Sequence, residues 1–380
     1  MDYDVIVVGA GPAGSCAAKM LADAGAAVAL VDAARFPRAK PCAGWLNARA
    51  AREFKFLDPV RRKIGAAPFT RLIFHSPDLA HTAEYGGRSH LGYIVSRGRF
   101  DAELVRLAKT SGAETFLGRK ATAVEAGERK VRVRLARGRC LTGRILIGAD
   151  GVRSAVAQTL GLRERWEQHQ LVMCLSRDIP LTRKQMADCF AGGRAIHVAL
   201  GFGLAPGYAW AFPGAGYVNV GVGVRSEEAP RLGALYKEWI AGLREHRLLP
   251  AKIGRKKPWG AAIPAGGALE FENHVGKRTL LIGDAGGFAA ASTGEGIYPG
   301  IRSASIAAEC VVEALAADRG KRRGATCQDA LLRFKHEWRR RMASYLQMPN
   351  VNVEFLLPMI FTNREIAKRF ARAFLFGENL

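Results

Sequence analysis

The sequence predicts an α/β fold with an inserted, strand-rich domain and a helical C-terminal segment. Three observations predict it: an apolar strand–helix–strand pattern over residues 4–32, a series of short strand-forming segments over 171–224, and a helical pattern over 325–380. The chain has 380 residues, of which 49% are hydrophobic and 24% are charged. This composition suffices for a buried core and excludes a disordered or collagen-like chain.

The N-terminal pattern begins with residues 4–9, an apolar run rich in β-branched residues that ends in glycine. Residues 12–25 follow as an alanine-rich helix, and residues 27–32 as a second buried strand that ends in Asp32. A glycine-rich turn between strand and helix, with an acid at the end of the next strand, is typical of a Rossmann-like dinucleotide site.

The turn of this unit matches the pattern G-x-G-x-x-G. Its first glycine allows a tight turn, the second lets the backbone approach a pyrophosphate, and the third lets the helix pack closely on the strand. The helix N-terminus offers amide donors to the phosphates, and the acid accepts hydrogen bonds from ribose hydroxyls. An acid there disfavours a 2′-phosphate, so we do not expect NADP as the tightly bound nucleotide. The predicted cofactor-binding residues of this unit are Gly9, Gly11, Pro12, Ala13, Gly14 and Asp32.

Two later strand ends also carry an aspartate beside glycines. The run 144–148 is followed by Ala149-Asp150-Gly151, and the run 279–283 is followed by Asp284, with a second glycine-rich stretch just beyond. A carboxylate in such a place can accept hydrogen bonds from ribityl or ribose hydroxyls, and the glycines let a flat ring lie against the backbone. With the N-terminal turn, these corners favour FAD over NAD. The predicted cofactor-binding residues here are Asp150, Gly151, Gly283, Asp284, Gly294, Gly296 and Ile297.

The other elements follow from hydrophobic periodicity and turn residues. The remainder after the last helix is expected to be helical and broken at Pro349 and Pro358. The expected elements are short strands over 71–95 and 113–147, a helix over 100–111, strands over 171–224, a helix over 231–247, a strand over 279–284 and a helix over 299–317.

One hairpin is expected within the strand-rich region, with its turn at Gly214-Ala215. That turn places Phe212 opposite Tyr217 and Trp210 opposite Asn219. Alternation along the two strands then separates an aromatic face with glycines from a face of alanines and valines. We interpret the aromatic face as room for an apolar or planar ligand, with ordinary packing against a helix as the alternative. The predicted substrate-binding residues are Tyr208, Trp210, Phe212 and Asn219.

With these motifs, the chain resembles the geranylgeranyl reductase family, within the flavoprotein group that includes p-hydroxybenzoate hydroxylase. The resemblance covers roughly residues 3–315. Besides the three glycine–aspartate corners, it includes three segments. Lys40-Pro-Cys42-Ala43-Gly44 is similar to the family's Cys-Gly-Gly segment near the flavin, with Ala43 replacing a glycine. Arg97 is similar to an arginine beside the FAD, and Tyr208–Pro213 to the Tyr-x-Trp-x-Phe-Pro stretch of the substrate cavity.

The resemblance implies a Rossmann-like FAD-binding domain with an inserted mixed β-sheet substrate domain. It adds Ala43, Gly44 and Arg97 to the cofactor site. It implies FAD as the cofactor, with NAD(P)H or an electron-carrier protein as the reductant. The expected boundaries are 1–70, 96–168 and 265–318 for the FAD-binding domain, 71–95 and 169–264 for the substrate domain, and 319–380 for a basic helical C-terminal segment.

Two residues are candidates for proton transfer. Cys42 is one, because the flanking Lys40 favours its thiolate, although packing alone would also explain it. Glu295 is the other, with a role as a helix N-terminal charge as the alternative. The seven cysteines are scattered and the histidines lack metal-ligand spacing, so we expect no metal site.

The charge is strongly positive: 57 Lys and Arg residues against 34 acids, a formal net charge of +23. Residues 319–380 hold 13 basic residues and five acids between apolar ones. This pattern favours a peripheral contact with a membrane or lipid, with a solvated helical cap as the alternative, and no motif indicates nucleic-acid binding. No apolar run reaches the ~18 residues of a membrane span, and the N-terminus lacks signal-peptide features. We therefore expect a cytoplasmic protein.

The sequence thus predicts an FAD-dependent oxidoreductase that reduces C=C bonds of an isoprenoid or other lipid-like, hydrophobic substrate. One alternative is an FAD-dependent monooxygenase that acts on an aromatic small molecule or an aromatic protein side chain, with halogenation as a weaker variant. Another is a flavin-bearing protein that binds a membrane or partner with little turnover.

Overall fold

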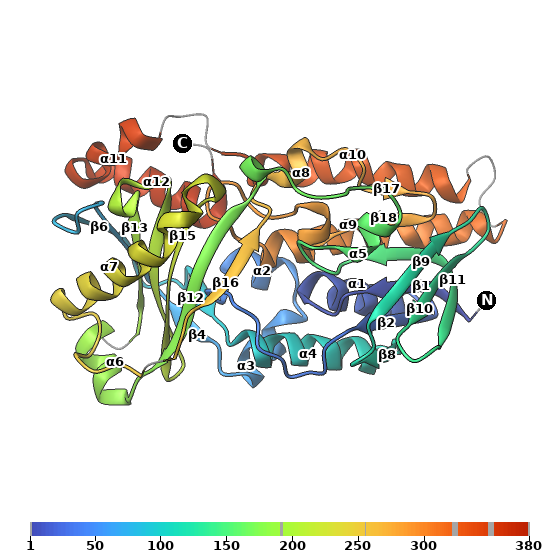
Figure 1. Ribbon diagram of the computed structural model, residues 1–380, viewed down its shortest axis with the longest axis horizontal. Helices are drawn as coiled ribbons and strands as arrows, with labels where there is room; N and C mark the ends of the chain where they lie inside the picture. The colour runs from blue at the N-terminus through green and yellow to red at the C-terminus, as the bar shows by residue number, and fades with distance from the viewer. Residues whose placement is uncertain (1, 191–192, 255, 321–325, 349–352, 379–380) are drawn as a thin grey trace. The chain divides into compact units, whose positions relative to one another are not determined.

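The computed structural model describes residues 2–190, 193–254, 256–320, 326–348 and 353–378 (Figure 1). The chain forms two compact units, each made of three segments of the chain. The first contains Met1–Arg38, Asp101–Gln170 and Pro264–Gln347, and the second contains Ala39–Phe100, Leu171–Ile263 and Met348–Leu380.

This division differs from the expected boundaries at residues 39–70 and 96–100 and within the expected C-terminal segment, which is divided between the two units at Met348. Residues 39–70 group with the second unit, because their strands pair with a strand of that unit. Residues 319–347 group with the first unit, because their helix packs along a helix of that unit. Residues 321–325, 349–352 and 379–380 of the expected C-terminal segment, Pro349 among them, lie outside the described residues.

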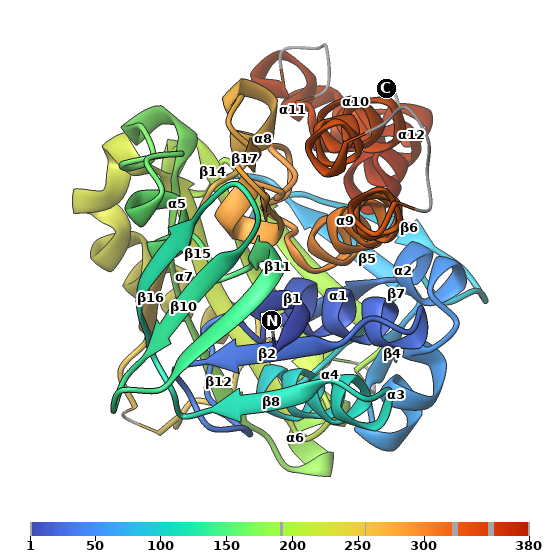
Figure 2. The same cartoon turned by 90° about the vertical axis from the view of Figure 1, so that its right-hand side faces the viewer.

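The first unit is built on a sheet in the order β17-β18-β11-β1-β2-β8, in which all strands but β17 run parallel (Figure 2). A meander of β9 and β10 continues antiparallel from β11. The strands are β1 (Tyr3–Val8), β2 (Val28–Asp32), β8 (Glu114–Leu117), β9 (Ala121–Ala126), β10 (Val131–Leu135), β11 (Cys140–Gly148), β17 (Val275–Gly276) and β18 (Thr279–Leu281).

The helices of the first unit are rich in small residues where they meet. α1 and α9 lie side by side, and α10 packs along α9 (Figure 2). Alanines and glycines on the facing sides of α1 and α9 allow this close approach. The helices are α1 (Pro12–Asp23), α5 (Ala155–Thr159), α8 (Gly267–Glu270), α9 (Ile297–Asp318) and α10 (Cys327–Leu346), with short 3₁₀ turns η1 (Gln168–Gln170) and η4 (Gly283–Gly286). α4 (Arg97–Thr110) begins in the second unit and continues in the first.

The second unit is built on a seven-stranded sheet in the order β16-β12-β15-β14-β13-β5-β6, with a separate sheet β3-β7-β4. Its strands are β3 (Trp45–Asn47), β4 (Ala67–Phe69), β5 (Arg71–His75), β6 (Thr82–Gly86), β7 (Gly92–Ile94), β12 (Val172–Pro180), β13 (Ala195–Leu200), β14 (Gly207–Gly214), β15 (Tyr217–Arg225) and β16 (Trp259–Ile263). Its helices are α2 (Ala48–Glu53), α3 (Leu57–Lys63), α6 (Arg183–Phe190), α7 (Leu232–Glu245), α11 (Val353–Thr362) and α12 (Arg364–Phe376), with turns η2 (Phe202–Leu204) and η3 (Ser226–Arg231).

The large sheet of the second unit is buried on both faces. The alanine and valine face of β14 and β15 packs against α7, where Trp239 is fully buried. The opposite, aromatic face packs against α12, where Phe374 meets Trp45 and Tyr208. The expected separation of the two faces is therefore present, and a helix covers the aromatic one.

The hairpin between β14 and β15 turns one residue later than expected. Gly214 pairs with Tyr217, so the turn is Ala215-Gly216, and Gly216 adopts a φ of +81°. The pairing shifts by two residues, which places Phe212 opposite Asn219 and leaves every side chain on its expected face. Gly216 explains the difference, because the left-handed conformation in this turn favours glycine.

Two other expectations were wrong. Pro358 lies in the middle of α11, which continues to Thr362, so the proline does not end the helix although its nitrogen cannot donate an internal hydrogen bond. The strand expected over 279–284 ends at Leu281, because Gly283 adopts a φ of +57° and opens η4. Within the described residues, no helix combines the length and the apolar character that crossing a bilayer requires.

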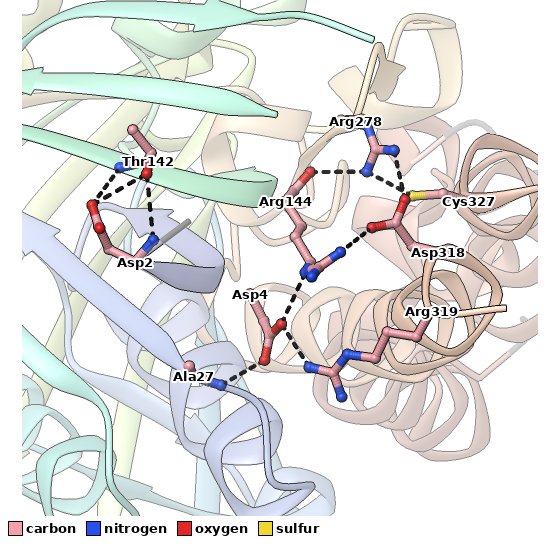
Figure 3. A network of polar contacts seen from close by, with 9 residues as sticks. All are labelled: Asp2, Asp4, Ala27, Thr142, Arg144, Arg278, Asp318, Arg319 and Cys327. Carbon is pink, nitrogen blue, oxygen red and sulfur yellow. Dashed lines mark hydrogen bonds and ion pairs between the residues drawn. The ribbon is translucent and has the colours of Figure 1, made fainter. Parts of the chain in front are cut away.

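An ion-pair network ties the first unit together at the N-terminal ends of its strands (Figure 3). Asp318 at the end of α9 accepts from Arg144 of β11 and from Arg278 just before β18, each at 2.6 Å. Asp4 of β1 accepts from Arg319 at 2.6 Å and lies 3.3 Å from Arg144. Burial raises the pKa of Asp318, but the hydrogen bonds from the two arginines outweigh it, so that pKa lies below its ordinary value.

We expect Asp318→Asn to lower the free energy of unfolding by about 2 kcal/mol, because the mostly buried Arg278 loses its charged partner. Urea denaturation at pH 7 measures this. The folded-state pKa of Asp318 is depressed, so its contribution is present above its ordinary pKa and is lost as pH falls through the folded value. The difference in the free energy of unfolding between the unaltered protein and Asp318→Asn should therefore become smaller below about pH 4.

The control is Asp188→Asn, which removes an exposed pair with Lys184 and should cost less than about 0.5 kcal/mol. Equal losses for the two variants would contradict a structural role for the network.

Candidate functional site

The three glycine–aspartate corners lie at one edge of the first unit's sheet. Val8 of β1 pairs with Gly148 of β11, and Gly148 pairs with Leu281 of β18, all in parallel register. Each strand therefore ends level with its neighbours, and the residues that follow them gather at the carboxyl ends. In open parallel sheets, this edge is where nucleotides bind.

The first corner depends on a glycine that touches the second corner. Gly9 has a φ of +103°, and a Cβ atom there would lie 2.2 Å from the carbonyl oxygen of Ala149. A Cβ at Gly14 would lie 1.8 Å from the carbonyl oxygen of Gly9. These glycines are required by the protein's own backbone, because any side chain would push β1, β11 and α1 apart.

Gly11 is different, because among the described residues a Cβ there would meet only Arg38, at 3.8 Å. Its φ of −69° suits any residue, and it caps α1 with no side-chain acceptor from the described residues. The first amides of α1 are therefore open to a ligand, beside the guanidinium of Arg38, which pairs with the buried Asp101 at 3.4 Å. An uncapped helix N-terminus beside an arginine fits a pyrophosphate.

Local sequence patterns did not predict Arg38. It lies in a loop of an arginine-rich chain, and no spacing singled it out.

Asp32 is held in place by the turn it faces. One carboxylate oxygen accepts from the amide of Ala10 and the other from the amide of Ala34, each at 2.7 Å. Each oxygen retains a further lone pair, so the carboxylate is oriented and still able to accept from ribose hydroxyls.

At the second corner, the Asp150 carboxylate is hydrogen-bonded by the protein's own chain. Its carboxylate accepts from the hydroxyl of Ser154 at 2.5 Å and from the amide of Val156 at 3.0 Å, at the start of α5. Burial raises the pKa of Asp150 above its ordinary value, although these hydrogen bonds act to lower it. Gly151 has a φ of +84°, and its Cβ position meets no atom of the described chain within 4 Å. The open backbone at Gly151 therefore suits a ligand better than the Asp150 carboxylate does.

The third corner is closed by a glycine. A Cβ at Gly296 would lie 3.2 Å from a carboxylate oxygen of Asp284, so the loop returns directly beside that acid. Gly296 also caps α9, which begins at Ile297, with no side-chain acceptor from the described residues. Gly294 in the same loop adopts a φ of +65°. A second uncapped helix N-terminus thus accompanies the three corners, as expected for a flavin nucleotide.

Glu295 lies in this loop and is buried, with 5% of its surface exposed. Its carboxylate accepts from the hydroxyl of Tyr345, near the end of α10. Its amide donates to the hydroxyl of Thr293 at 3.2 Å. The structure therefore holds Glu295 inside the loop. A role in proton transfer stays a prediction.

The Cys42 segment lies in the second unit and is fixed at three points. Asn219 donates to the carbonyl oxygen of Cys42 at 3.1 Å, and the amide of Gly44 donates to the Cys42 Sγ at 3.3 Å. The amide of Val95 donates to the carbonyl oxygen of Gly44 at 2.8 Å. Gly44 has a φ of +75°, and a Cβ there would lie 2.3 Å from the carbonyl oxygen of Val95. Half-buried Cys42 therefore has an amide donor beside its sulfur. Ala43 follows it, and Arg97, which begins α4, is half-buried.

The aromatic hairpin face is more closed than expected. Trp210 and Phe212 are buried, and a Cβ at Gly221 would lie 2.2 Å from the indole of Trp210. The indole thus fills the room that we expected beside Gly221. Asn219 is buried and accepts from the indole nitrogen at 2.7 Å while donating to Asp178 at 2.8 Å. Tyr208 is half-buried.

The sequence matches a known family over most of its length. The FAD binding domain family matches residues 2–326. The chain is 32% identical to a menaquinone reductase of Mycobacterium tuberculosis, over 80% of this chain and 76% of that one. It is 30% identical to digeranylgeranylglycerophospholipid reductase 2 of Methanopyrus kandleri, over 89% of this chain and 82% of that one.

Solved structures share the fold. A geranylgeranyl bacteriochlorophyll reductase-like protein from Thermoplasma acidophilum superposes with a TM-score of 0.79 at 20% identity, covering 99% of this chain and 97% of that one. A mutant of the halogenase PltM in complex with FAD gives a TM-score of 0.71 at 17% identity, covering 91% of this chain and 74% of that one. At these identities the likeness concerns the fold alone. Together with the family match, these findings confirm the predicted fold class, FAD as the cofactor and the resemblance itself. The chain belongs to the FAD binding domain family and is an FAD-dependent oxidoreductase of the geranylgeranyl reductase type.

Proposed function

We propose that this protein reduces carbon–carbon double bonds of an isoprenoid or similar lipid. The observation that carries the proposal is the likeness at 30–32% identity to relatives named menaquinone reductase and digeranylgeranylglycerophospholipid reductase. Both names refer to molecules with isoprenoid chains. Half-buried Tyr208 suits such an apolar chain, whereas Trp210 and Phe212 are buried in the core below it, so we propose that the substrate lies near Tyr208.

We propose that FAD is held by the residues at the carboxyl edge of the first unit's sheet. The amides at the start of α1 and the Arg38 guanidinium bind its pyrophosphate, and Asp32 orients its adenosine ribose. The backbone at Gly151 and the loop from Gly294 to Ile297 receive the remainder, beside Asp284. When bound and reduced, FAD would supply the hydride for one carbon of the double bond, and NAD(P)H or an electron-carrier protein would serve as the reductant.

Cys42 is our candidate for the proton that the other carbon needs. The proton is held at Sγ, and the amide of Gly44 stabilises the thiolate that remains after transfer. Asn219 holds the Cys42 peptide by its carbonyl oxygen while being locked by Trp210 and Asp178. Asn219 is therefore a positioning residue in this proposal. An isolated double bond is a poor hydride acceptor, so orientation and exclusion of water must supply much of the rate.

A peripheral contact with a lipid surface belongs to the same proposal. In the second unit, Leu204 of η2 is 85% exposed and Phe355 of α11 is 67% exposed. The outer face of α12 carries exposed Arg364, Lys368 and Arg369. Apolar side chains and basic groups of this kind suit the boundary between acyl chains and anionic headgroups.

The cofactor site is tested with Gly11→Val. Because the Gly11 backbone conformation suits valine, and Arg38 at 3.8 Å is the only described residue within 4 Å of the Cβ position, we expect the protein to fold. The valine occupies the place of the pyrophosphate, so FAD affinity should fall about 100-fold or more. Titration of FAD fluorescence with apoprotein measures this, and a thermal melt of the apoprotein checks folding.

The matched control is Gly233→Ala, at a glycine in α7 whose Cβ position meets no described atom within 4 Å. It should bind FAD as the unaltered protein does. A Gly11→Val protein that retains FAD would contradict the proposed pyrophosphate site.

The reaction is tested anaerobically by mixing dithionite-reduced holoprotein with a panel of prenyl diphosphates, prenylated quinones and digeranylgeranyl lipids. We expect reoxidation of the flavin and products heavier by two hydrogens, measured by mass spectrometry. No reoxidation with any member of the panel, or oxygenated products formed only with NAD(P)H and O₂, would reject the proposal in favour of another reaction.

The role of Cys42 is tested with Cys42→Ala. Loss of a general acid should lower kcat about 100-fold and leave FAD affinity unchanged. Cys189→Ala, at another half-buried cysteine of the same unit, should leave kcat unchanged. A Cys42→Ala enzyme with full kcat would remove Cys42 from the reaction.

A further inference from the structure

The loop between the third corner and α9 is held from outside the segment that the family matches. The match ends at residue 326, and α10 begins at Cys327. Near the end of α10, the hydroxyl of Tyr345 donates to the carboxylate of Glu295, and the carbonyl oxygen of Leu346 accepts from the amide of Ala291 at 2.9 Å. Two consecutive residues of α10 therefore hydrogen-bond to the loop, one at Glu295 and the other at Ala291.

The loop is also closed on itself. The amide of Ala290 donates to the carbonyl oxygen of Glu295 at 2.9 Å, and the amide of Gly294 donates to the carbonyl oxygen of Ala290 at 2.8 Å. The contacts with α10 thus act on a compact turn, so a displacement of Glu295 moves its neighbour Gly296 as well. Gly296 lies against the carboxylate of Asp284 and caps α9.

Packing fixes the position of Tyr345 itself. Its ring packs edge-on against the ring of Tyr298, in the first turn of α9, with ring centroids 5.0 Å apart. Tyr345 is buried, as are Trp338 and Met342 on the same side of α10. At its other end, α10 is fixed by a capping box between Thr326 and Asp329. The hydroxyl is therefore presented by a rigid helix.

A second contact joins α10 to the same corner. The Trp338 ring packs against Phe288 and His274, with centroids 5.3 Å and 5.1 Å away. His274 contacts the carbonyl oxygen of Gly286 through Nε2 at 2.9 Å. Burial lowers the pKa of His274 to about 3, so the ring is neutral and donates through that nitrogen. α10 thus contacts the end of η4 indirectly, through the His274 ring.

We propose that Tyr345 is a positioning residue for FAD: through the buried carboxylate of Glu295, it fixes the loop that closes beside Asp284 and opens α9. Tyr345 lies outside the three glycine–aspartate corners and outside the matched segment. Glu295 then works as the buried link between α10 and the loop. The inference rests on the cofactor and not on the substrate, so it stands or falls independently of double-bond reduction.

The test is Tyr345→Phe, which removes one hydroxyl and keeps the ring. We expect FAD to bind about tenfold more weakly, because a buried carboxylate loses a donor and the loop loses its anchor. Fluorescence titration of apoprotein with FAD measures the affinity, and the visible spectrum of the bound flavin reports the altered loop. A thermal melt of the apoprotein shows whether the variant folds.

Two further variants make the result specific. Tyr236→Phe, at a buried tyrosine of α7 in the second unit, should leave FAD affinity and spectrum unchanged. Glu295→Gln should weaken binding, and adding Tyr345→Phe to it should cause little further loss, because both act through one contact. Affinity within twofold of the unaltered protein and an unchanged spectrum for Tyr345→Phe would overturn the proposal, as would an equal loss in Tyr236→Phe or fully additive losses in the double variant.

Discussion

The close approach of the Gly9 backbone to Ala149 is the constraint on which the cofactor site depends. A single Cβ at Gly9 would lie 2.2 Å from the carbonyl oxygen of Ala149. Because β1 and β11 are adjacent and in parallel register, this contact brings the first corner directly against the second. A Cβ at Gly14 would likewise lie too close to the carbonyl oxygen of Gly9. The strand ends can therefore converge only where side chains are absent.

The two ends of this sheet have different tasks. At the carboxyl ends, backbone amides and glycines are left open, as at Gly11 and Gly151. At the other ends, Asp4 and Asp318 are tied to three arginines, and these ion pairs join β1, β11 and α9 (Figure 3). The ion pairs that stabilise the sheet thus lie at the opposite strand ends from the open amides. The edge that binds the ligand therefore does not need to supply these stabilising contacts.

In the second unit, the seven-stranded sheet contributes to two hydrophobic cores, one on each of its faces. Its valine face is sealed by α7, and its aromatic face by α12. On the aromatic face, Asn219 connects a buried indole, an aspartate and the Cys42 peptide by hydrogen bonds. A buried amide with all these partners is fixed in orientation, and this fixes the Cys42 segment in turn.

Local patterns determined much of this protein. The glycine-rich turn, the three strand ends and the alternation along the hairpin could all be predicted, because each depends on residues close together in the chain. The hairpin turn was misplaced by one residue, since Gly214 and Gly216 are both able to form it and only the pairing with Tyr217 decides.

What the tertiary structure alone decided depends on contacts between distant segments. Arg38 beside Gly11, Asn219 on the Cys42 carbonyl oxygen, α12 over the aromatic face and Tyr345 on Glu295 have no signal in local spacing. Local spacing also gave no sign that the Asp150 carboxylate accepts hydrogen bonds from the chain itself at the start of α5. Periodicity shows which face of an element is buried, but the partner on that face is chosen by the packing of the whole unit, and it is the partner that determines what a polar side chain can still bind.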